Sequence, residues 1–180
     1  CLGGGDIATM QHSGNIIDNN SVHDYALVDT VYNAGIGADG YGCTVTHNEI
    51  YNAPHNAINY TASAMVMEYN YIHDVCQNAN DAGAIYDGGW GSTTIFRNNI
   101  VKDVKNIYKA EAMGRVQSLG SPNGYFSDDG GSQKTVDSNL FINISGNALA
   151  FGGGRDNTLT NNIIVDGSIG YDDRVYYKVK

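Results

Sequence analysis

The sequence is poor in the residues that build long helices, disulfide frameworks and zinc sites. Leu occurs 6 times and Glu 3 times in 180 residues, so long helices are not favoured. The three cysteines include no Cys-x-x-Cys pair, and no spacing of Cys or His suits a zinc ion. We therefore predict no metal site, and we interpret Cys43 and Cys76 as small buried apolar residues.

Basic residues and long apolar runs are also scarce. Ten Lys and Arg face 19 Asp and Glu, giving a formal net charge of −9 that disfavours nucleic acid and anionic membranes as partners. No run of 18 apolar residues predicts a membrane span, and no basic, apolar leader predicts an intact signal peptide. The abrupt start at Cys1 suggests a segment of a longer protein, whose remainder or whose other copies would cover the ends of the fold.

Glycine and asparagine are abundant instead. The chain holds 23 Gly, 21 Asn and 16 Asp, residues that favour tight turns and resist helix interiors. Because 42% of the residues are hydrophobic and evenly distributed, disorder is not expected. Composition thus predicts an all-β protein with many turns, forming a single domain over residues 1–180.

A repeat is visible once the chain is aligned on the pattern Asn-x-apolar-x-(Asn or Asp). Its six copies begin at Asn20, Asn48, Asn70, Asn99, Asn139 and Asn162. An apolar residue precedes each Asn by three positions, namely Ile17, Val45, Met67, Phe96, Val136 and Leu159. Both apolar columns are therefore filled in all six copies.

The shortest spacings between these Asn anchors are 22 and 23 residues, and the longer ones carry insertions. A unit of this length, with short strands and Asn- and Gly-rich turns, describes one coil of a parallel β-helix. Each Asn is expected to adopt the left-handed turn conformation and to hydrogen-bond the Asn of the next coil as a ladder. We predict a right-handed parallel β-helix of about six to seven coils.

Several segments add a family resemblance to this pattern. NEIYNAPHNAI at 48–58, YNYIHDV at 69–75, DAGAIY at 81–86, DDG at 128–130 and GGGRDN at 152–157 carry it. With the coil columns, they resemble right-handed parallel β-helix proteins of the pectate-lyase-like superfamily. More narrowly, they are similar to bacterial carbohydrate-active proteins of the glycoside hydrolase family 141 type. The resemblance implies a secreted, cell-surface or periplasmic protein that acts on polysaccharide.

Paired carboxylates are the expected catalytic groups. Insertions at about 77–81 and 107–123 would build the wall of a groove, and neighbouring coils lie about 4.8 Å apart. Such spacing can place two carboxyl groups at the separations that glycoside hydrolysis requires. The resemblance marks Asp81, Asp128 and Asp129 as catalytic candidates, and Asp87 is a weaker rival. Alternatively, these residues only cap turns beside Gly.

Other residues are candidates for contact with the sugar. The post-insertion strands would place Tyr60, Tyr86, Asp87, Trp90 and Tyr125 near the groove floor, where aromatic rings stack on sugar faces. His55 could line the groove or belong to a turn. Arg155 and Asp156 could bind substrate beyond the three glycines or form an ion pair within a turn. The aromatic rings could instead stack between coils.

Three functions remain open from the sequence. A glycoside hydrolase with paired Asp residues and no cofactor is preferred. A polysaccharide lyase of the same fold would need a basic residue and often Ca²⁺, which Asp clusters could hold. A non-catalytic adhesin or fibre segment is the alternative outside enzymes, although coils of unequal length argue against a plain stalk.

Overall fold

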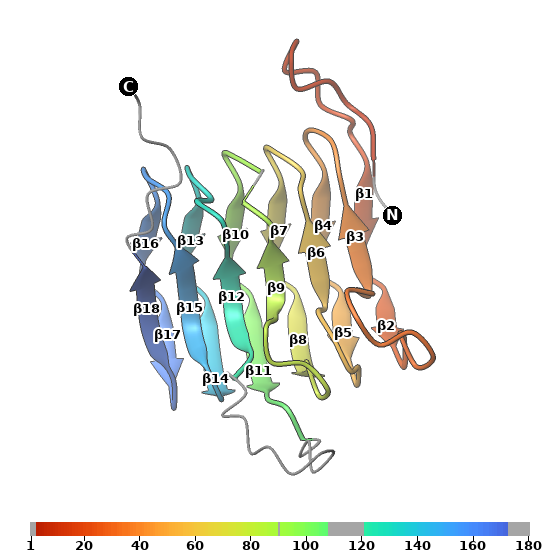
Figure 1. Cartoon of the computed structure of the whole chain (residues 1–180). Coiled ribbons are helices and arrows are strands. Elements are labelled where there is room, and N and C mark those ends of the chain that lie inside the picture. Colours follow the sequence, from red (N-terminus) through yellow and green to blue (C-terminus); the bar gives the residue numbers. More distant parts are fainter. Residues whose placement is uncertain (1–2, 90, 108–120, 173–180) are drawn as a thin grey trace.

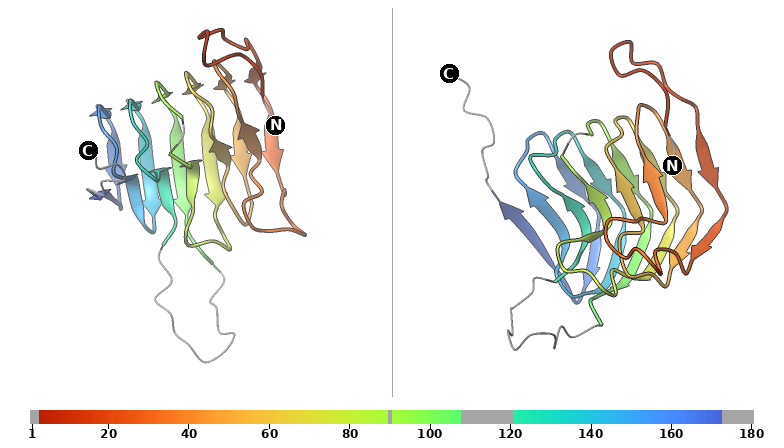
Figure 2. Two further views of the ribbon diagram at one scale, coloured as in Figure 1. Left: turned by 45° about the horizontal axis from the view of Figure 1, so that its top comes forward. Right: turned by 45° about the vertical axis from the view of Figure 1, so that its right-hand side comes forward.

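The computed structural model describes residues 3–89, 91–107 and 121–172. These form a right-handed parallel β-helix of six coils, each contributing one strand to each of three six-stranded sheets (Figure 1). The coils stack in sequence order from one end of the solenoid to the other (Figure 2). The predicted fold class is confirmed. The described residues contain no helix that could cross a membrane.

The strands are short and recur in the same order in every coil. The first sheet contains β1 (Ile16–Asp18), β4 (Thr44–Thr46), β7 (Val66–Glu68), β10 (Ile95–Arg97), β13 (Thr135–Asp137) and β16 (Thr158–Thr160). The second contains β2 (Ser21–His23), β5 (Glu49–Tyr51), β8 (Tyr71–Val75), β11 (Ile100–Val104), β14 (Leu140–Ile144) and β17 (Ile163–Val165). The third contains β3 (Ile36–Ala38), β6 (Ile58–Tyr60), β9 (Gly83–Asp87), β12 (Asn123–Ser127), β15 (Asn147–Gly152) and β18 (Ser168–Asp172).

The two apolar columns predicted from the repeat are the inward faces of the first and second sheets. The strand register aligns Val45 with Met67 and Met67 with Phe96 in the first sheet. In the second sheet it aligns Ile72 with Val101. All five side chains are buried, so the aliphatic stack predicted from the repeat is the core of the solenoid. Cys43 and Cys76 are free and buried, as predicted.

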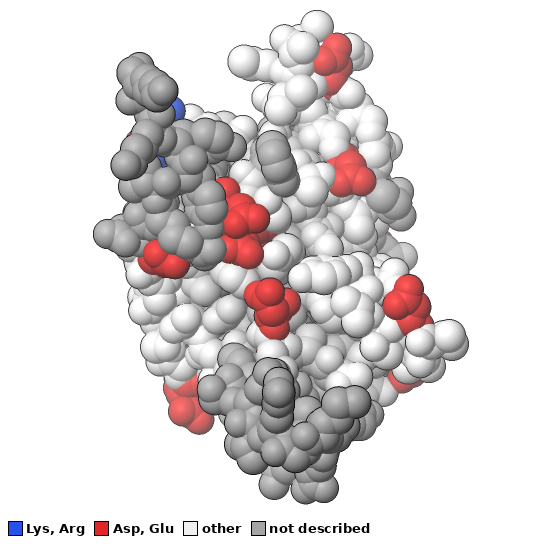
Figure 3. Space-filling view, viewed as in Figure 1, with Lys and Arg blue, Asp and Glu red and all other residues white. Residues whose placement is uncertain are grey.

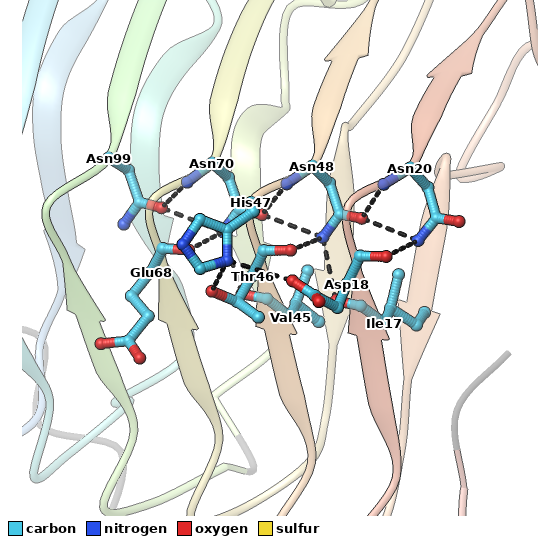
Figure 4. A network of polar contacts seen from close by, with 10 residues as sticks. All are labelled: Ile17, Asp18, Asn20, Val45, Thr46, His47, Asn48, Glu68, Asn70 and Asn99. Carbon is cyan, nitrogen blue, oxygen red and sulfur yellow. Dashed lines mark hydrogen bonds and ion pairs between the residues drawn. The ribbon is translucent and has the colours of Figure 1, made fainter.

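The asparagine ladder lies at the turn between the first and second sheets (Figure 4). The backbone N–H and the Nδ2 of Asn70 both donate to Oδ1 of Asn99, at 2.9 and 3.0 Å. Oδ1 of Asn70 in turn accepts from the backbone N–H and the Nδ2 of Asn48, both at 3.0 Å. Its Nδ2 also reaches the carbonyl oxygens of Val45 and Glu68. The same pattern joins Asn20 to Asn48, and Asn99 through Asn139 to Asn162.

The left-handed backbone conformation falls beside the ladder and not on it, which corrects one expectation. The residue before each ladder Asn has φ between 53° and 57°, at Asn19, His47, Tyr69, Asn98, Ser138 and Asn161. The last residue of each repeat is also left-handed, at Asp24, Asn52, Asp74, Asp103, Asn143 and Asp166. The ladder Asn is needed for its amide, whereas Asn and Asp at the end of the repeat tolerate positive φ.

The ladder generates a prediction about stability. Asn70→Ala should lower the free energy of unfolding by about 3 kcal/mol, because it removes the oxygen that accepts two hydrogen bonds from the buried Asn48. The backbone N–H of residue 70 keeps its own acceptor on Asn99. Asn20→Ala is the control, since Asn20 lies at the exposed end of the ladder and should cost under about 1 kcal/mol. Chemical denaturation measures both values. Equal losses would contradict a structural role for the buried amides.

Candidate functional site

The outer face of the third sheet brings together the side chains that could take part in binding or catalysis. The register aligns Asn59 with Tyr86, Tyr86 with Phe126 and Phe126 with Ala150 across β6, β9, β12 and β15. Because side chains alternate along a strand, this column points away from the core. Among the described residues, the middle of this face presents acidic side chains and no Lys or Arg (Figure 3).

Insertions occur where the chain passes from the second to the third sheet. They occupy residues 24–35 between β2 and β3, 76–82 between β8 and β9, and 105–122 between β11 and β12. The second and third insertions occur where the spacing of the Asn anchors predicts them, although residues 108–120 lie outside the described residues. The prediction missed the first insertion, whose signal is the 28-residue spacing from Asn20 to Asn48.

Tyr86 is the centre of the candidate site. Its hydroxyl donates a hydrogen bond of 3.1 Å to Oδ2 of Asp128. Burial raises the pKa of Tyr86, and the carboxylates of Asp128 and Asp81 add to the rise by opposing a phenolate. Phe126 packs edge-on against its ring, with centroids 5.3 Å apart. Tyr86 is therefore held as a neutral hydrogen-bond donor to Asp128.

His55 lies beside this centre and beneath the first insertion. Its side chain is 4% exposed, and its Nδ1 has no hydrogen-bond partner among the described residues. Burial lowers the pKa of His55, while the Asn56 side chain and, less strongly, the carboxylate of Asp81 oppose that change. The ring of Tyr32 covers it, with centroids 5.1 Å apart, and also approaches Tyr86 at 6.3 Å.

The catalytic candidates Asp81 and Asp128 lie beyond opposite ends of neighbouring strands of the third sheet, and Asp128 is the one that contacts Tyr86. The register pairs Asp87 with Ser127, so Asp128 is level with residue 88, whereas Asp81 precedes β9. They therefore do not occupy matching positions in neighbouring coils, which is the arrangement that the coil spacing predicts for a catalytic pair. Asp129 is exposed in the turn after β12, and its backbone N–H donates to Oδ1 of Asp128 at 2.9 Å.

Three residues predicted on the groove floor lie inside the solenoid, which corrects their placement. Tyr60, Asp87 and Tyr125 are at most 1% exposed, because they occupy inward positions of β6, β9 and β12. The hydroxyls of Tyr60 and Tyr125 share a hydrogen bond of 2.7 Å. Asp87 forms a buried ion pair with Lys134, whose Nζ lies 2.6 Å from Oδ2 of Asp87.

This interior network satisfies most of its own polar groups. Ser127 Oγ and the backbone N–H of Gly89 each donate to Asp87 at 3.1 Å. Lys134 also donates to the carbonyl oxygen of Gly91, and its Nζ lies 5.3 Å from the centroid of the Tyr60 ring. Burial raises the pKa of Asp87 and lowers that of Lys134, while their mutual attraction opposes both shifts.

Lys134 could have been predicted from the sequence. It precedes the core residue Val136 by two positions, and side chains two apart share one face of a strand. Cys43, Met65 and Thr94 hold the same position before Val45, Met67 and Phe96 in other coils, and all three are buried. The alternation therefore placed a Lys inside, where only an acidic partner could compensate its charge.

The candidates Arg155 and Asp156 lie in the turn that follows β15 of the third sheet. Arg155 and Asp156 form an exposed ion pair, with Nε and Oδ2 3.7 Å apart. Gly154 has φ of +85°, and a Cβ there would collide with the carbonyl oxygen of Gly131 in the preceding coil. Close stacking of the coils thus explains this glycine. Trp90 lies outside the described residues.

A pocket of about 240 Å³ continues the outer face toward the last coil. Phe126, Ala150 and Gly170 line it as one aligned column, and Tyr171, which pairs with the inward Phe151, also lines it. Asn147 lines its edge. Within the described ranges, no group of three or more His, Cys, Asp or Glu side chains is placed to hold a metal ion.

The buried ion pair generates a second stability prediction. Lys134→Met should cost about 3–5 kcal/mol in free energy of unfolding, because it leaves the Asp87 carboxylate buried without its countercharge. Asp87→Asn combined with Lys134→Met removes both charges and should recover most of that loss. Denaturation of the single and double variants measures the difference. A double variant as unstable as the sum of its single changes would contradict the pairing.

No protein-family model, no curated protein and no solved structure matches this chain significantly.

Proposed function

We propose that this chain is a carbohydrate-active β-helix, acting as a glycoside hydrolase on a polysaccharide bound along the outer face of the third sheet. Asp81 and Asp128 are the proposed catalytic carboxyl groups. The observation that carries the proposal is the hydrogen bond of 3.1 Å from the Tyr86 hydroxyl to Asp128 on the acidic outer face of the third sheet. The resemblance to secreted β-helix proteins implies that the protein would act extracellularly, at the cell surface or in the periplasm.

The two carboxyl groups would have different roles. Asp128 accepts the hydrogen bond of the Tyr86 hydroxyl and a backbone N–H of the following turn, contacts that suit an ionised base or nucleophile. Asp81 is exposed and would act as the general acid that protonates the leaving oxygen. Asp129 would support Asp128 through its backbone, with its own carboxylate pointing to solvent.

The shape and composition of the face support a sugar ligand. Tyr32, Tyr86 and Phe126 offer aromatic surface, which packs against the apolar faces of sugar rings. An acidic face without a described Lys or Arg at its centre suits a neutral polymer better than a polyuronate. The resemblance to pectate-lyase-like β-helix proteins, and to glycoside hydrolase family 141 in particular, points to the same class of substrate.

The proposal predicts the behaviour of two carboxylate variants. Asp81→Asn and Asp128→Asn should each lower hydrolysis by at least about 100-fold, because each removes a group that transfers a proton or attacks the sugar. Release of reducing sugar from arabinoxylan, xyloglucan and galactomannan measures the rate.

Asp166→Asn is the matched control for this experiment. Asp166 is an exposed Asp in a left-handed turn after the second sheet, and Asn accepts that backbone conformation. This variant should retain full activity. If the unaltered protein hydrolyses a glycan and both site variants do so equally well, the catalytic assignment is wrong. If none of the glycans is hydrolysed, the enzymatic proposal itself fails.

A further inference from the structure

We propose that copies of this chain stack end to end, with the last coil of one copy pairing with the first coil of the next. The partner at each end of the solenoid is then a second copy of the same chain. This interface is separate from the proposed glycan site, because it uses the end edges of the three sheets and not the outer face of the third (Figure 2).

Both ends of the solenoid present strands with an open edge. β1, β2 and β3 are the outermost strands of the three sheets at the first coil, and β16, β17 and β18 are outermost at the last coil. Among the described residues, each of these six strands pairs with one neighbouring strand only. An open strand edge is a template for pairing with another strand. Because every pairing is parallel, a second copy in the same orientation would continue all three sheets.

The asparagine ladder ends in complementary groups. At the last coil, Oδ1 of Asn162 accepts two hydrogen bonds from Asn139, but its backbone N–H has no acceptor among the described residues. At the first coil, Asn20 donates to Asn48, and its own Oδ1 accepts no hydrogen bond from the described residues. Asn162 therefore offers the donors, and Asn20 the acceptor, of the contact that joins every other pair of successive ladder residues.

The apolar columns of the core would also continue across this junction. Each column begins at an inward residue of the first coil and ends at an inward residue of the last coil. Extending the register into a second copy aligns Leu159 with Ile17, Ile164 with Val22, and Ile169 with Ile36.

The shapes of the two ends suit this alignment. The first coil ends in a hollow of about 760 Å³, lined among others by Ile17, Val22 and Ile36. The last coil ends in inward side chains that are exposed, including Ile169 at 58% and Tyr171 at 66%. Stacking would bury these side chains in the hollow of the next copy, and burial of apolar surface drives association.

Two pairs of acidic residues would meet at the junction and oppose it. The register aligns Asp166 with Asp24, and Asp172 with Asp39. The solenoid already tolerates such a pair, because Asp74 and Asp103 occupy the same turn position in neighbouring coils. Salt screens repulsion between exposed charges. Association driven by the apolar columns and the ladder should therefore strengthen as ionic strength rises.

Sedimentation equilibrium of the 180-residue chain tests the proposal. Because an interface between two different ends does not close on itself, stacking produces open assemblies. The average mass should rise with protein concentration above the 19.3 kDa of one chain, without levelling at a dimer, and should rise further with added salt. A single chain at every concentration, or association that weakens with salt, would overturn the proposal.

Two isoleucines of the last coil provide a matched pair of variants. Ile169 and Ile163 are 58% and 61% exposed. Ile169 aligns with the buried Leu149, whereas Ile163 aligns with the outward Leu140. Ile169→Lys should weaken association at least about tenfold, because an inward charge blocks a sheet edge. Ile163→Lys makes the same change in net charge and should leave association unchanged. Equal effects of the two changes would reject the predicted register.

A mixing experiment tests which ends meet. Val22→Lys places a charge at the first coil, so neither this variant nor Ile169→Lys should associate alone. Their mixture should form dimers, because one variant keeps an intact last coil and the other an intact first coil. A dimer of either variant alone, or no dimer in the mixture, would contradict head-to-tail stacking.

Circular dichroism establishes that both variants retain the β-helix before they are mixed. Asn20→Ala takes the place of Val22→Lys if that variant does not fold, because it removes the ladder acceptor at the same end. Asn20→Ala should weaken self-association at least about tenfold. Unchanged self-association of Asn20→Ala would show that the ladder does not continue between copies, and would overturn the proposed junction.

Discussion

The hydrogen bonds between successive coils, and the buried asparagine ladder above all, are the constraint on which the rest of the structure depends. Each ladder amide accepts two hydrogen bonds from the preceding coil and donates to the next, so it fixes the height and the phase of both coils. A shift of one residue would turn every inward side chain outward. With the ladder in place, Met67 stacks on Phe96 and Ile72 on Val101, and the core is continuous.

A fixed register also divides the third sheet into two chemically different faces. The inward positions hold Tyr60, Asp87 and Tyr125, and the outward positions hold Tyr86 and Phe126 one residue away. Charge is tolerated inside because Lys134 and Asp87 neutralise each other and find further partners. The polar groups outside, such as the hydrogen-bonded Tyr86 and Asp128, lie on the surface, which is why chemistry is expected on that face.

Insertions act within this regular frame without disturbing it. They all occur where the chain passes from the second sheet to the third, so none of them interrupts a strand. Tyr32 illustrates the consequence, because a residue of the first coil reaches His55 and Tyr86 in the next two. Neighbouring coils thus supply a shared site, although each coil is built from local contacts.

The sequence by itself determined the fold class, the six coils, the two apolar columns and the ladder, because each follows from a repeat that is local and periodic. The alternation of side chains along a strand also predicts that Lys134 is buried. The prediction that Tyr60, Asp87 and Tyr125 line a groove did not take this alternation into account. Only the tertiary structure decided that the Tyr86 hydroxyl bonds Asp128, and that Tyr32 covers His55. Those contacts depend on how turns and irregular insertions lie against neighbouring coils, and no periodic pattern encodes that path.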